Sequence, residues 1–197
     1  QRVALARALA PRPSLILLDE PFSALDAALR NQVRDEVFDV LRAEQATAVL
    51  VTHDQQEALS VADQVAVLLG GRIAQCADPN TLYEAPADLA VATFIGEAVV
   101  VDGVVERGVV RTALGTHALR PGAPPAGPVE VVVRPEQIEV VPVQVDGGAA
   151  AVVTGRSFYG HDGVAHLQVA GIGSAVSARL PAGHLPERGA SVWLKVR

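Results

Sequence analysis

The sequence predicts an α/β segment followed by an all-β segment, and three observations support this order. Up to about Ile95, short apolar runs typical of strands alternate with stretches of helical period. After Gly96 the helical spacing stops, and Val-rich runs separated by Gly and Pro take over. Half of the 197 residues are hydrophobic, which is enough for a sizeable core. We therefore expect one domain over residues 1–95 with a mostly parallel sheet, and a small β barrel or sandwich over residues 96–197.

The first elements are a helix and a strand. Residues 1–9 read as a helix already under way, with no N-cap residue before them, so we expect the natural protein to begin upstream. Residues 15–18 are wholly apolar and precede two acids. Such a run is typical of a strand buried on both faces of a parallel sheet.

A long amphipathic helix and a second strand come next. Residues 27–44 carry Leu29, Val33, Val37 and Leu41 at a spacing of four, with charged residues between them, which predicts a helix with one apolar face. Residues 47–52 are rich in β-branched side chains and predict a second buried strand. The rest of the segment predicts a helix, two strands joined at Gly70-Gly71, and two short helices, over residues 55–61, 64–69, 72–76, 79–84 and 87–94.

The second segment contains short strands with turn signals between them. A Pro- and Gly-rich loop is expected over residues 121–128. The Val-rich runs that predict strands cover residues 99–101, 104–105, 109–110, 129–133, 138–145, 150–153, 164–169 and 192–196.

Composition limits the class of function. The net charge of −6 and the pI of about 5.3 disfavour a nucleic-acid-binding domain, which usually has a basic face. Cys76 is the one cysteine, so an internal disulfide is impossible, and a lone thiol fits a reducing cytoplasm. We interpret Cys76 as a small apolar residue. The sequence has no apolar stretch long enough to predict a membrane span.

Asp19 and Glu20 follow the first strand at its carboxyl end, where open α/β sheets bind their ligands. An Asp there can hold Mg²⁺ beside nucleotide phosphates. A Glu one residue later points differently, and could polarise the water that attacks a γ-phosphate. Taken alone, the pair could equally be an acidic strand end exposed to solvent.

His53 follows the second strand in Thr52-His53-Asp54. Two parallel strands can end at one crevice, so His53 can approach the Asp19–Glu20 pair and contact a γ-phosphate or the attacking water. Taken alone, it could be a surface or helix-capping histidine. Asp54 comes directly before a predicted helix and is expected to be its N-cap.

These motifs together resemble the nucleotide-binding subunit of ABC transporters, in order and spacing over residues 1–95. The matching segments are RVALARAL at 2–9, LILLDEP at 15–21, SALD at 23–26, VTHD at 51–54 and EA at 57–58. The resemblance implies a P-loop NTPase-type α/β fold that uses ATP and Mg²⁺. It assigns Asp19 as the Mg²⁺-associated acid, Glu20 as the catalytic glutamate and His53 as the switch histidine. Asp26 resembles the D-loop acid that contacts the partner subunit, and we group it with Asp19 as a cofactor-binding candidate.

The sequence departs from that family in the loops that bind the nucleotide phosphates. The loop G-x-x-x-x-G-K-[ST] is absent, since Lys195 is the only lysine and lies between Leu194 and Val196. The signature loop, which should precede Gln1, is also missing. We therefore expect this chain to be inactive as an ATPase on its own.

The second segment resembles the OB-like domain called TOBE, which some ABC importers carry at the C-terminus. Val133-Arg134-Pro135-Glu136 is similar to its central motif, and residues 157–162 to a later strand and turn. Arg134 and Glu136 could form contacts across a dimer, or lie at a solvent-facing strand end. His161 and Asp162 suggest a metal or ligand pair, but the glycines on both sides favour a turn.

The resemblance implies a peripheral subunit on the cytoplasmic face of the cell membrane. Its expected partners are a second ATPase subunit, transmembrane permease subunits and a periplasmic or lipoprotein solute-binding protein, with no nucleic acid. The run PFSALDAALR at 21–30 favours the ferric-iron branch over polyamine or sugar importers. One alternative is a regulatory or ligand-binding module with an inert ATPase remnant. A soluble ABC ATPase of repair or translation is a third possibility, which the β segment disfavours.

Overall fold

The computed structural model describes residues 2–120 and 122–197. Gln1, in the first predicted helix, and Pro121, in the predicted loop, lie outside the described residues. The chain divides into two compact units, one up to Val91 and one from Ala92 onward. None of the helices described is long and apolar enough to cross a membrane.

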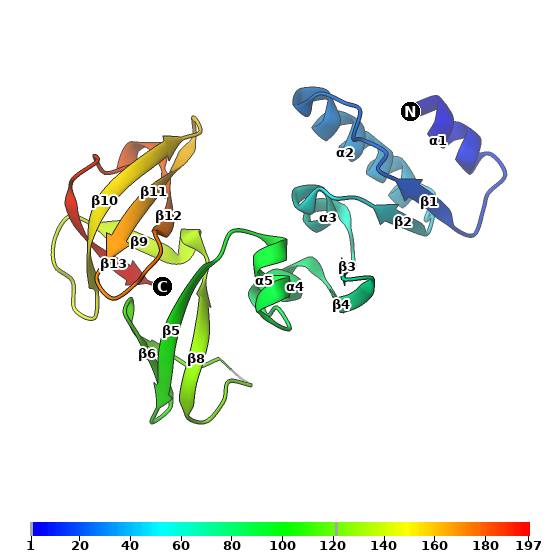
Figure 1. Cartoon of the computed structure of the whole chain (residues 1–197). Helices are drawn as coiled ribbons and strands as arrows, with labels where there is room; N and C mark the ends of the chain where they lie inside the picture. The colour runs from blue at the N-terminus through cyan, green and yellow to red at the C-terminus, as the bar shows by residue number, and fades with distance from the viewer. Residues whose placement is uncertain (1, 121) are drawn as a thin grey trace. The chain divides into compact units, whose positions relative to one another are not determined.

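The first unit mixes helices and strands (Figure 1). Its elements are α1 (Arg2–Leu9), β1 (Ile16–Asp19), α2 (Ala27–Ala43), β2 (Ala48–Val51), α3 (Gln55–Val61), β3 (Val65–Leu69), β4 (Arg72–Ala77), α4 (Pro79–Glu84) and the first residues of α5 (Leu89–Ile95).

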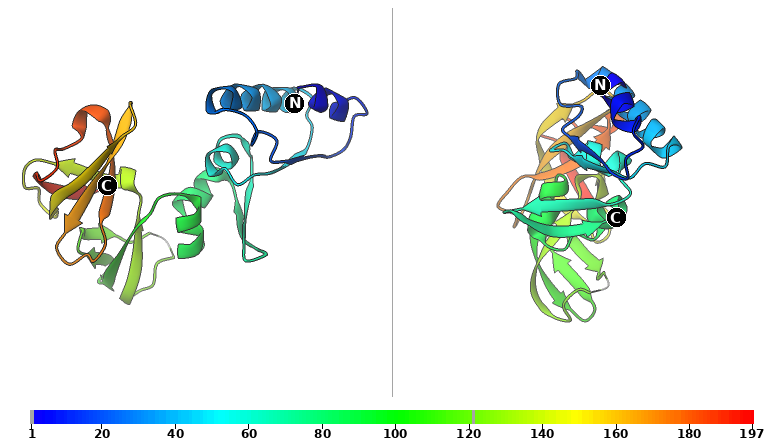
Figure 2. Two further views of the ribbon diagram at one scale, coloured as in Figure 1. Left: turned by 45° about the horizontal axis from the view of Figure 1, so that its top comes forward. Right: turned by 90° about the vertical axis from the view of Figure 1, so that its right-hand side faces the viewer.

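The expected mostly parallel sheet is wrong for the described structure. β1 and β2 pair in parallel with Ile16 opposite Ala48, but they form a sheet of two strands. β3 and β4 form a separate antiparallel pair, visible as a hairpin in Figure 2. The turn between them contains Gly70 and Gly71, both at positive φ, as a tight two-residue turn requires. The Gly-Gly prediction is therefore confirmed, and this hairpin does not extend the parallel ladder.

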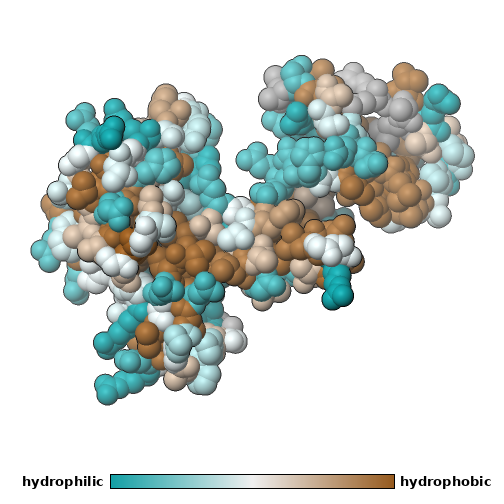
Figure 3. Space-filling view, viewed as in Figure 1, coloured by the Kyte–Doolittle hydropathy of each residue, from teal (hydrophilic) through white to brown (hydrophobic). Residues whose placement is uncertain are grey.

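β1 and β2 are covered on one face and open on the other. Ile16 is buried, whereas the next residue, Leu17, is 72% exposed, and Val51 on β2 is also exposed. Figure 3 shows hydrophobic surface over this part of the unit. The prediction of strands buried on both faces is therefore wrong, because α2 packs against one face of the pair while the other has no covering layer among the described residues.

α2 supplies most of the covering face. Asp26 caps its N-terminus by accepting a hydrogen bond from the Leu29 amide. Val33, Val37 and Leu41 are buried at the predicted spacing of four and pack with Ile16 and Phe22. Leu29, expected on the same stripe, is largely exposed, so the buried face begins one turn later.

The second unit is built from two antiparallel sheets that follow the end of α5 (Figure 1). One sheet has the order β7-β6-β5-β8, and the other β12-β11-β10-β13-β9. The strands and 3-10 turns are β5 (Val99–Glu106), β6 (Val109–Thr112), β7 (Gly115–Ala118), β8 (Gly127–Val133), η1 (Pro135–Gln137), β9 (Ile138–Val141), β10 (Ala149–Phe158), β11 (Asp162–Val169), β12 (Val176–Pro181), η2 (Ala182–His184) and β13 (Ser191–Val196).

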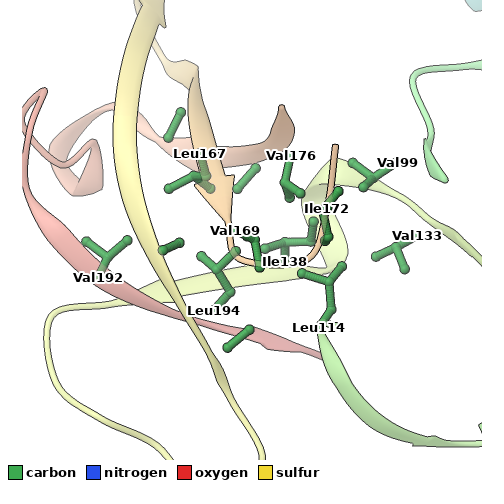
Figure 4. Packing of buried hydrophobic residues seen from close by; sticks show 14 of the residues in the cluster. Val99, Leu114, Val133, Ile138, Leu167, Val169, Ile172, Val176, Val192 and Leu194 are labelled. Atoms are coloured by element: carbon green, nitrogen blue, oxygen red, sulfur yellow. The ribbon is translucent and has the colours of Figure 1, made fainter. Parts of the chain in front are cut away.

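Both sheets of the second unit share one hydrophobic core (Figure 4). Val99 and Val133 from the four-stranded sheet point toward Leu167, Val176 and the other labelled residues of the five-stranded sheet. The alternation along β10 explains how a strand contributes to this core, since Ala149, Ala151 and Val153 are buried while the residues between them are exposed. The five-stranded sheet curls around this core into a nearly closed, barrel-like shape.

The sequence missed two strands of this unit. β7 has little apolar character, and β12 has no run of adjacent valines, although Val176, Ala178 and Leu180 alternate inward along it. The predicted loop over residues 121–128 ends earlier, because β8 begins at Gly127. Pro128 can lie within β8 because this strand is at the edge of its sheet. On the outer side of an edge strand no backbone N–H is needed for pairing, and proline has none.

Arg134 is buried, with 4% of its surface exposed, so neither the predicted solvent-facing position nor an exposed dimer contact fits it. Its Nη1 donates to the carbonyl oxygens of Ala92, Gly96 and Glu97, over 2.8, 3.2 and 3.1 Å. A cation at the C-terminal end of a helix satisfies carbonyls that have no partner within the helix. Arg134 therefore fixes the end of α5 to the β-rich unit.

Candidate active site

The carboxyl ends of β1 and β2 lie side by side. Asp19 is the last residue of β1 and pairs in register with Val51, the last residue of β2. The ladder continues one step further, because the Glu20 amide donates to the Val51 carbonyl over 2.8 Å. The residues that follow the two strands, Glu20 and His53 among them, are thereby brought to one edge of the pair.

Glu20 has an unusual backbone conformation. Its φ is +42°, in the left-handed region that side chains other than Gly and Asn rarely adopt. The Ser23 amide and hydroxyl both contact the Glu20 carbonyl, over 3.3 and 2.9 Å, and close a tight turn after the strand. Non-glycine residues held at positive φ cost about 1–3 kcal/mol and concentrate at functional sites. The strain turns Glu20 away from the course of β1.

Glu20 and His53 are in direct contact. Glu20 Oε1 and His53 Nδ1 are 2.8 Å apart, although 33 residues separate them in the sequence. Both side chains reach solvent, with 43% of Glu20 and 75% of His53 exposed. The pair is therefore accessible to a ligand at the strand ends.

The pKa of His53 is raised above its usual value. The main cause is the hydrogen bond that the protonated ring donates to the Glu20 carboxylate, followed by the negative charge of the same carboxylate. Asp54 and Glu57 add smaller effects in the same direction. Because these acids favour the imidazolium, a larger fraction of His53 is protonated near neutral pH than of an isolated histidine, and the charged ring can donate a hydrogen bond to a negatively charged group.

The structure places Asp26 and Asp54 as helix caps. Asp26 Oδ1 accepts from Leu29 N over 2.9 Å at the start of α2, and Asp54 Oδ1 accepts from Glu57 N over 3.1 Å at the start of α3. The prediction that Asp54 is an N-cap is confirmed. Asp26 lies in the turn after Glu20, and the carboxylate predicted to bind cofactor is engaged in this cap.

Arg30 links these two turns and was missed by sequence reasoning. Its Nη2 donates to the Leu25 carbonyl over 2.9 Å, and its Nη1 is 3.7 Å from Asp54 Oδ2. Arg30 therefore joins the turn before α2 to the turn that carries His53. The available signal was a basic residue in the first turn of a helix, where the helix dipole favours acids instead.

The strand-end carboxylates suit Mg²⁺ in chemistry but do not form a complete metal site. Mg²⁺ is commonly held by one or two carboxylates together with waters and substrate phosphates. Asp19 and Glu20 provide such oxygens, and Asp19 is exposed. In residues 2–120 and 122–197 there is no group of three His, Cys, Asp or Glu side chains that could hold a metal ion. The donor set therefore fits a Mg²⁺ ion that also binds nucleotide phosphates.

His161 and Asp162 belong to a turn, as the flanking glycines predict. The Tyr159 amide donates to the Asp162 carbonyl, and Gly160 between them has a φ of +93°. Asp162 is paired with Arg179 on the neighbouring strand β12, which lowers the pKa of the Asp162 carboxyl. The Asp162 carboxylate thus serves a cross-strand ion pair.

Comparison with known proteins relates the whole chain to iron-import ATP-binding proteins. It is 42% identical over 196 residues to the Fe(3+) ions import ATP-binding protein FbpC of Serratia marcescens, covering 100% of this chain and 56% of that protein. It is 50% identical over 163 residues to FbpC 1 of Rhodococcus jostii (strain RHA1), covering 82% of this chain and 46% of that protein. The TOBE domain family matches residues 131–197. The chain spans about half the length of the curated relatives it matches.

Proposed function

Since this chain is a relative of ABC transporter ATP-binding proteins that end in a TOBE domain, and matches about half their length, we propose that it is part of the ATP-hydrolysing subunit of an ABC importer. The observation that carries this proposal is the contact between Glu20 Oε1 and His53 Nδ1 at the ends of two parallel strands. A catalytic carboxylate and a histidine at this position are what the sequence motifs lead one to expect.

The proposed roles follow from the chemistry of each group. Asp19 contributes oxygen to a Mg²⁺ ion that neutralises phosphate charge. Glu20 accepts a hydrogen bond from the attacking water and orients it toward the γ-phosphate. His53, whose pKa the nearby acids raise, donates to the γ-phosphate or holds the same water. Asp26 caps α2 and is the residue of this set through which a partner ATPase subunit would contact the site.

The transported solute is proposed from the relatives alone. The proteins cited above are named for Fe(3+) import, and the identities support ferric iron as the cargo of the complete system. The assembly then contains two ATPase subunits, transmembrane permease subunits and a solute-binding protein, with this subunit at the cytoplasmic face of the membrane. No side chain of the candidate active site is proposed to touch the cargo.

A chimaera tests the proposal. The part of the Serratia marcescens relative that precedes the matched region is fused to this chain, so that a phosphate-binding loop expected there joins Asp19 and Glu20. We expect ATP hydrolysis by the chimaera and none by the 197-residue chain, which has no G-x-x-x-x-G-K-[ST] loop. Glu20→Gln in the chimaera should slow turnover about 10²–10⁴-fold and leave ATP binding intact.

Glu44→Gln is the matched control, since Glu44 is an exposed residue after α2. It should hydrolyse ATP at the rate of the parent chimaera. A folded chimaera that binds ATP and hydrolyses it equally well with Glu20→Gln would overturn the role given to Glu20. An inert chimaera that does not bind ATP would favour a regulatory module with an inactive ATPase remnant.

A further inference from the structure

A hollow of about 350 Å³ lies within the β-rich unit, on the outward face of β11 and β12. His166 and Ser177 form its floor, while their sequence neighbours Leu167 and Val176 point into the core. The segment after α5, including Glu97, and the ring of Tyr159 form its walls. A volume of this size is at the lower end of the range for small-molecule sites.

The wall of the hollow is held in place by a buried residue. Arg134 donates to the carbonyls of Gly96 and Glu97, and 4% of Arg134 is exposed. The backbone that carries the Glu97 side chain is thereby hydrogen-bonded to the residue that precedes η1. A preformed wall reduces the ordering cost that a ligand would otherwise meet on binding.

The floor of the hollow offers hydrogen-bonding groups and free space. His166 and Ser177 face each other on adjacent strands, with Nδ1 of the histidine 3.4 Å from Oγ of the serine. A bulge in β10 brings Gly155 opposite His166. Gly155 adds no side chain beside the imidazole, and a Cβ built there would lie 3.5 Å from Cδ2 of His166.

The charge of the lining favours a cation. Glu97 is the one carboxylate among the described residues that line the hollow, and neither Lys nor Arg is among them. Arg179, which interacts electrostatically with Glu97, is already paired with Asp162. Tyr159, which is also among the lining residues, has an aromatic ring of the kind that attracts ammonium groups. An anion would meet the Glu97 carboxylate without a basic partner in the lining.

We propose that this hollow binds a small organic cation that carries an amine and at least one hydroxyl group. The ammonium donates to Glu97 and lies against Tyr159, and the hydroxyl exchanges hydrogen bonds with Ser177 and His166. An organic cation is favoured over a metal ion because the described residues contain no cluster of three His, Cys, Asp or Glu side chains. Neither Glu20 nor His53 is among the residues that line the hollow, and the proposal does not depend on the ATPase function.

The test is an NMR titration of the 197-residue chain with ethanolamine at pH 7. We expect saturable shifts of the backbone amides of Glu97, His166 and Ser177. Ethylene glycol, which lacks the charge, and glycolate, which reverses it, should give no saturable shifts at these amides. Magnesium chloride distinguishes a metal site. Equal binding of ethanolamine and ethylene glycol, or shifts with magnesium alone, would overturn the proposal.

Substitutions in the lining test which residues contact the bound ethanolamine. Glu97→Gln should weaken ethanolamine binding by roughly 10- to 100-fold, as expected for a lost charge-assisted hydrogen bond. Glu106→Gln is the matched control, because Glu106 is an exposed acid of β5 outside the hollow, and it should bind as the parent does. Tyr159→Leu, at a position that is 58% exposed, should weaken binding several-fold. Unchanged affinity in both Glu97→Gln and Tyr159→Leu refutes the site.

Discussion

The guanidinium of Arg134 donates to the carbonyl of Ala92, 42 residues earlier in the chain, and so joins the end of α5 to the turn η1. The same nitrogen also contacts the carbonyls of Gly96 and Glu97. The sequence places Arg134 in a short motif that it shares with TOBE domains. The structure shows that this arginine is a buried anchor for the segment that enters the β-rich unit.

Replacing Arg134 tests the anchor. Arg134→Met keeps much of the side-chain volume and removes the donors to the buried carbonyl of Ala92 and to the part-buried carbonyls of Gly96 and Glu97. We expect a loss of about 3 kcal/mol in the free energy of unfolding of the β-rich unit, measured by urea denaturation. The exposed Arg156→Met should change stability by no more than about 0.5 kcal/mol. Equal stability of the two variants would show that the buried hydrogen bonds contribute little.

Glu20 should control the pKa of His53 in this chain even without nucleotide. Glu20→Gln removes both the charge and the acceptor that raise the pKa of His53, so its imidazole should titrate at a lower pH. NMR titration of the His53 ring protons measures this directly. Glu44→Gln, which removes an exposed acid after α2, is the control and should leave the His53 titration as in the parent. An unaltered His53 titration would mean that the two side chains are not in contact in solution.

Because the pKa of His53 is raised in the folded chain, the stability of the fold should depend on pH in a defined direction. Since the folded chain holds the proton more tightly than the unfolded chain, the contribution is fully present below the unfolded pKa of about 6.5. It is lost as the pH rises through the higher folded pKa. In Glu20→Gln this contribution should be absent, and comparison of unfolding midpoints from pH 6 to pH 9 checks it.

His117 should act in the opposite direction. Its Nε2 is buried without a hydrogen-bond partner, and burial lowers the pKa of His117. The neutral form is favoured in the folded state, so the associated stability is present above about pH 6.5 and is lost as the pH falls below it. When the pH is lowered from 7.5 to 5, His117→Phe should therefore lose less stability than the parent chain does. The exposed His184→Phe should show the parental pH dependence, and a common profile for all three proteins would contradict the prediction.

Gly163 should not tolerate a side chain. A Cβ added there would lie 2.5 Å from the Ser157 carbonyl oxygen and would also clash with Leu185. Gly163→Ala is expected to destabilise the β-rich unit by about 1–3 kcal/mol, the usual range for overpacking. Gly173→Ala is the control, since no heavy atom lies within 4 Å of the added carbon. Thermal unfolding of both variants decides the matter, and a fully stable Gly163→Ala would show that β10 and β11 can separate to make room.

The parts of the fold that were predicted well depend on local sequence. The Gly70-Gly71 turn and the cap at Asp54 are short-range features, so a few neighbouring residues determine them. The burial of Arg134 could not be predicted, because its partners lie about 40 residues away and only the folded chain brings them together. β7 was missed because its sequence has little apolar character.

The candidate site likewise has some features that the sequence predicts and others that it does not. The acids after β1 and the histidine after β2 are visible in the sequence, and parallel pairing brings Glu20 and His53 to one edge. The left-handed backbone of Glu20 is a feature that no residue pattern indicates, and the one sequence signal for the bridge through Arg30 was its place as a basic residue near the start of α2. The catalytic roles of these residues stay predictions until the chimaera is assayed.

The strand order also bears on how the chain folds in time. β10, β11 and β12 are consecutive and pair antiparallel through short turns, so each pairing closes only a small loop. The segment between β1 and β2 contains α2 and its flanking turns. Pairing β1 with β2 therefore closes a longer loop, which costs more chain entropy before the strands come into contact. Low contact order favours fast folding. We therefore expect the β10–β11–β12 meander to nucleate early, and the edge of β1 and β2 that carries Glu20 and His53 to assemble late.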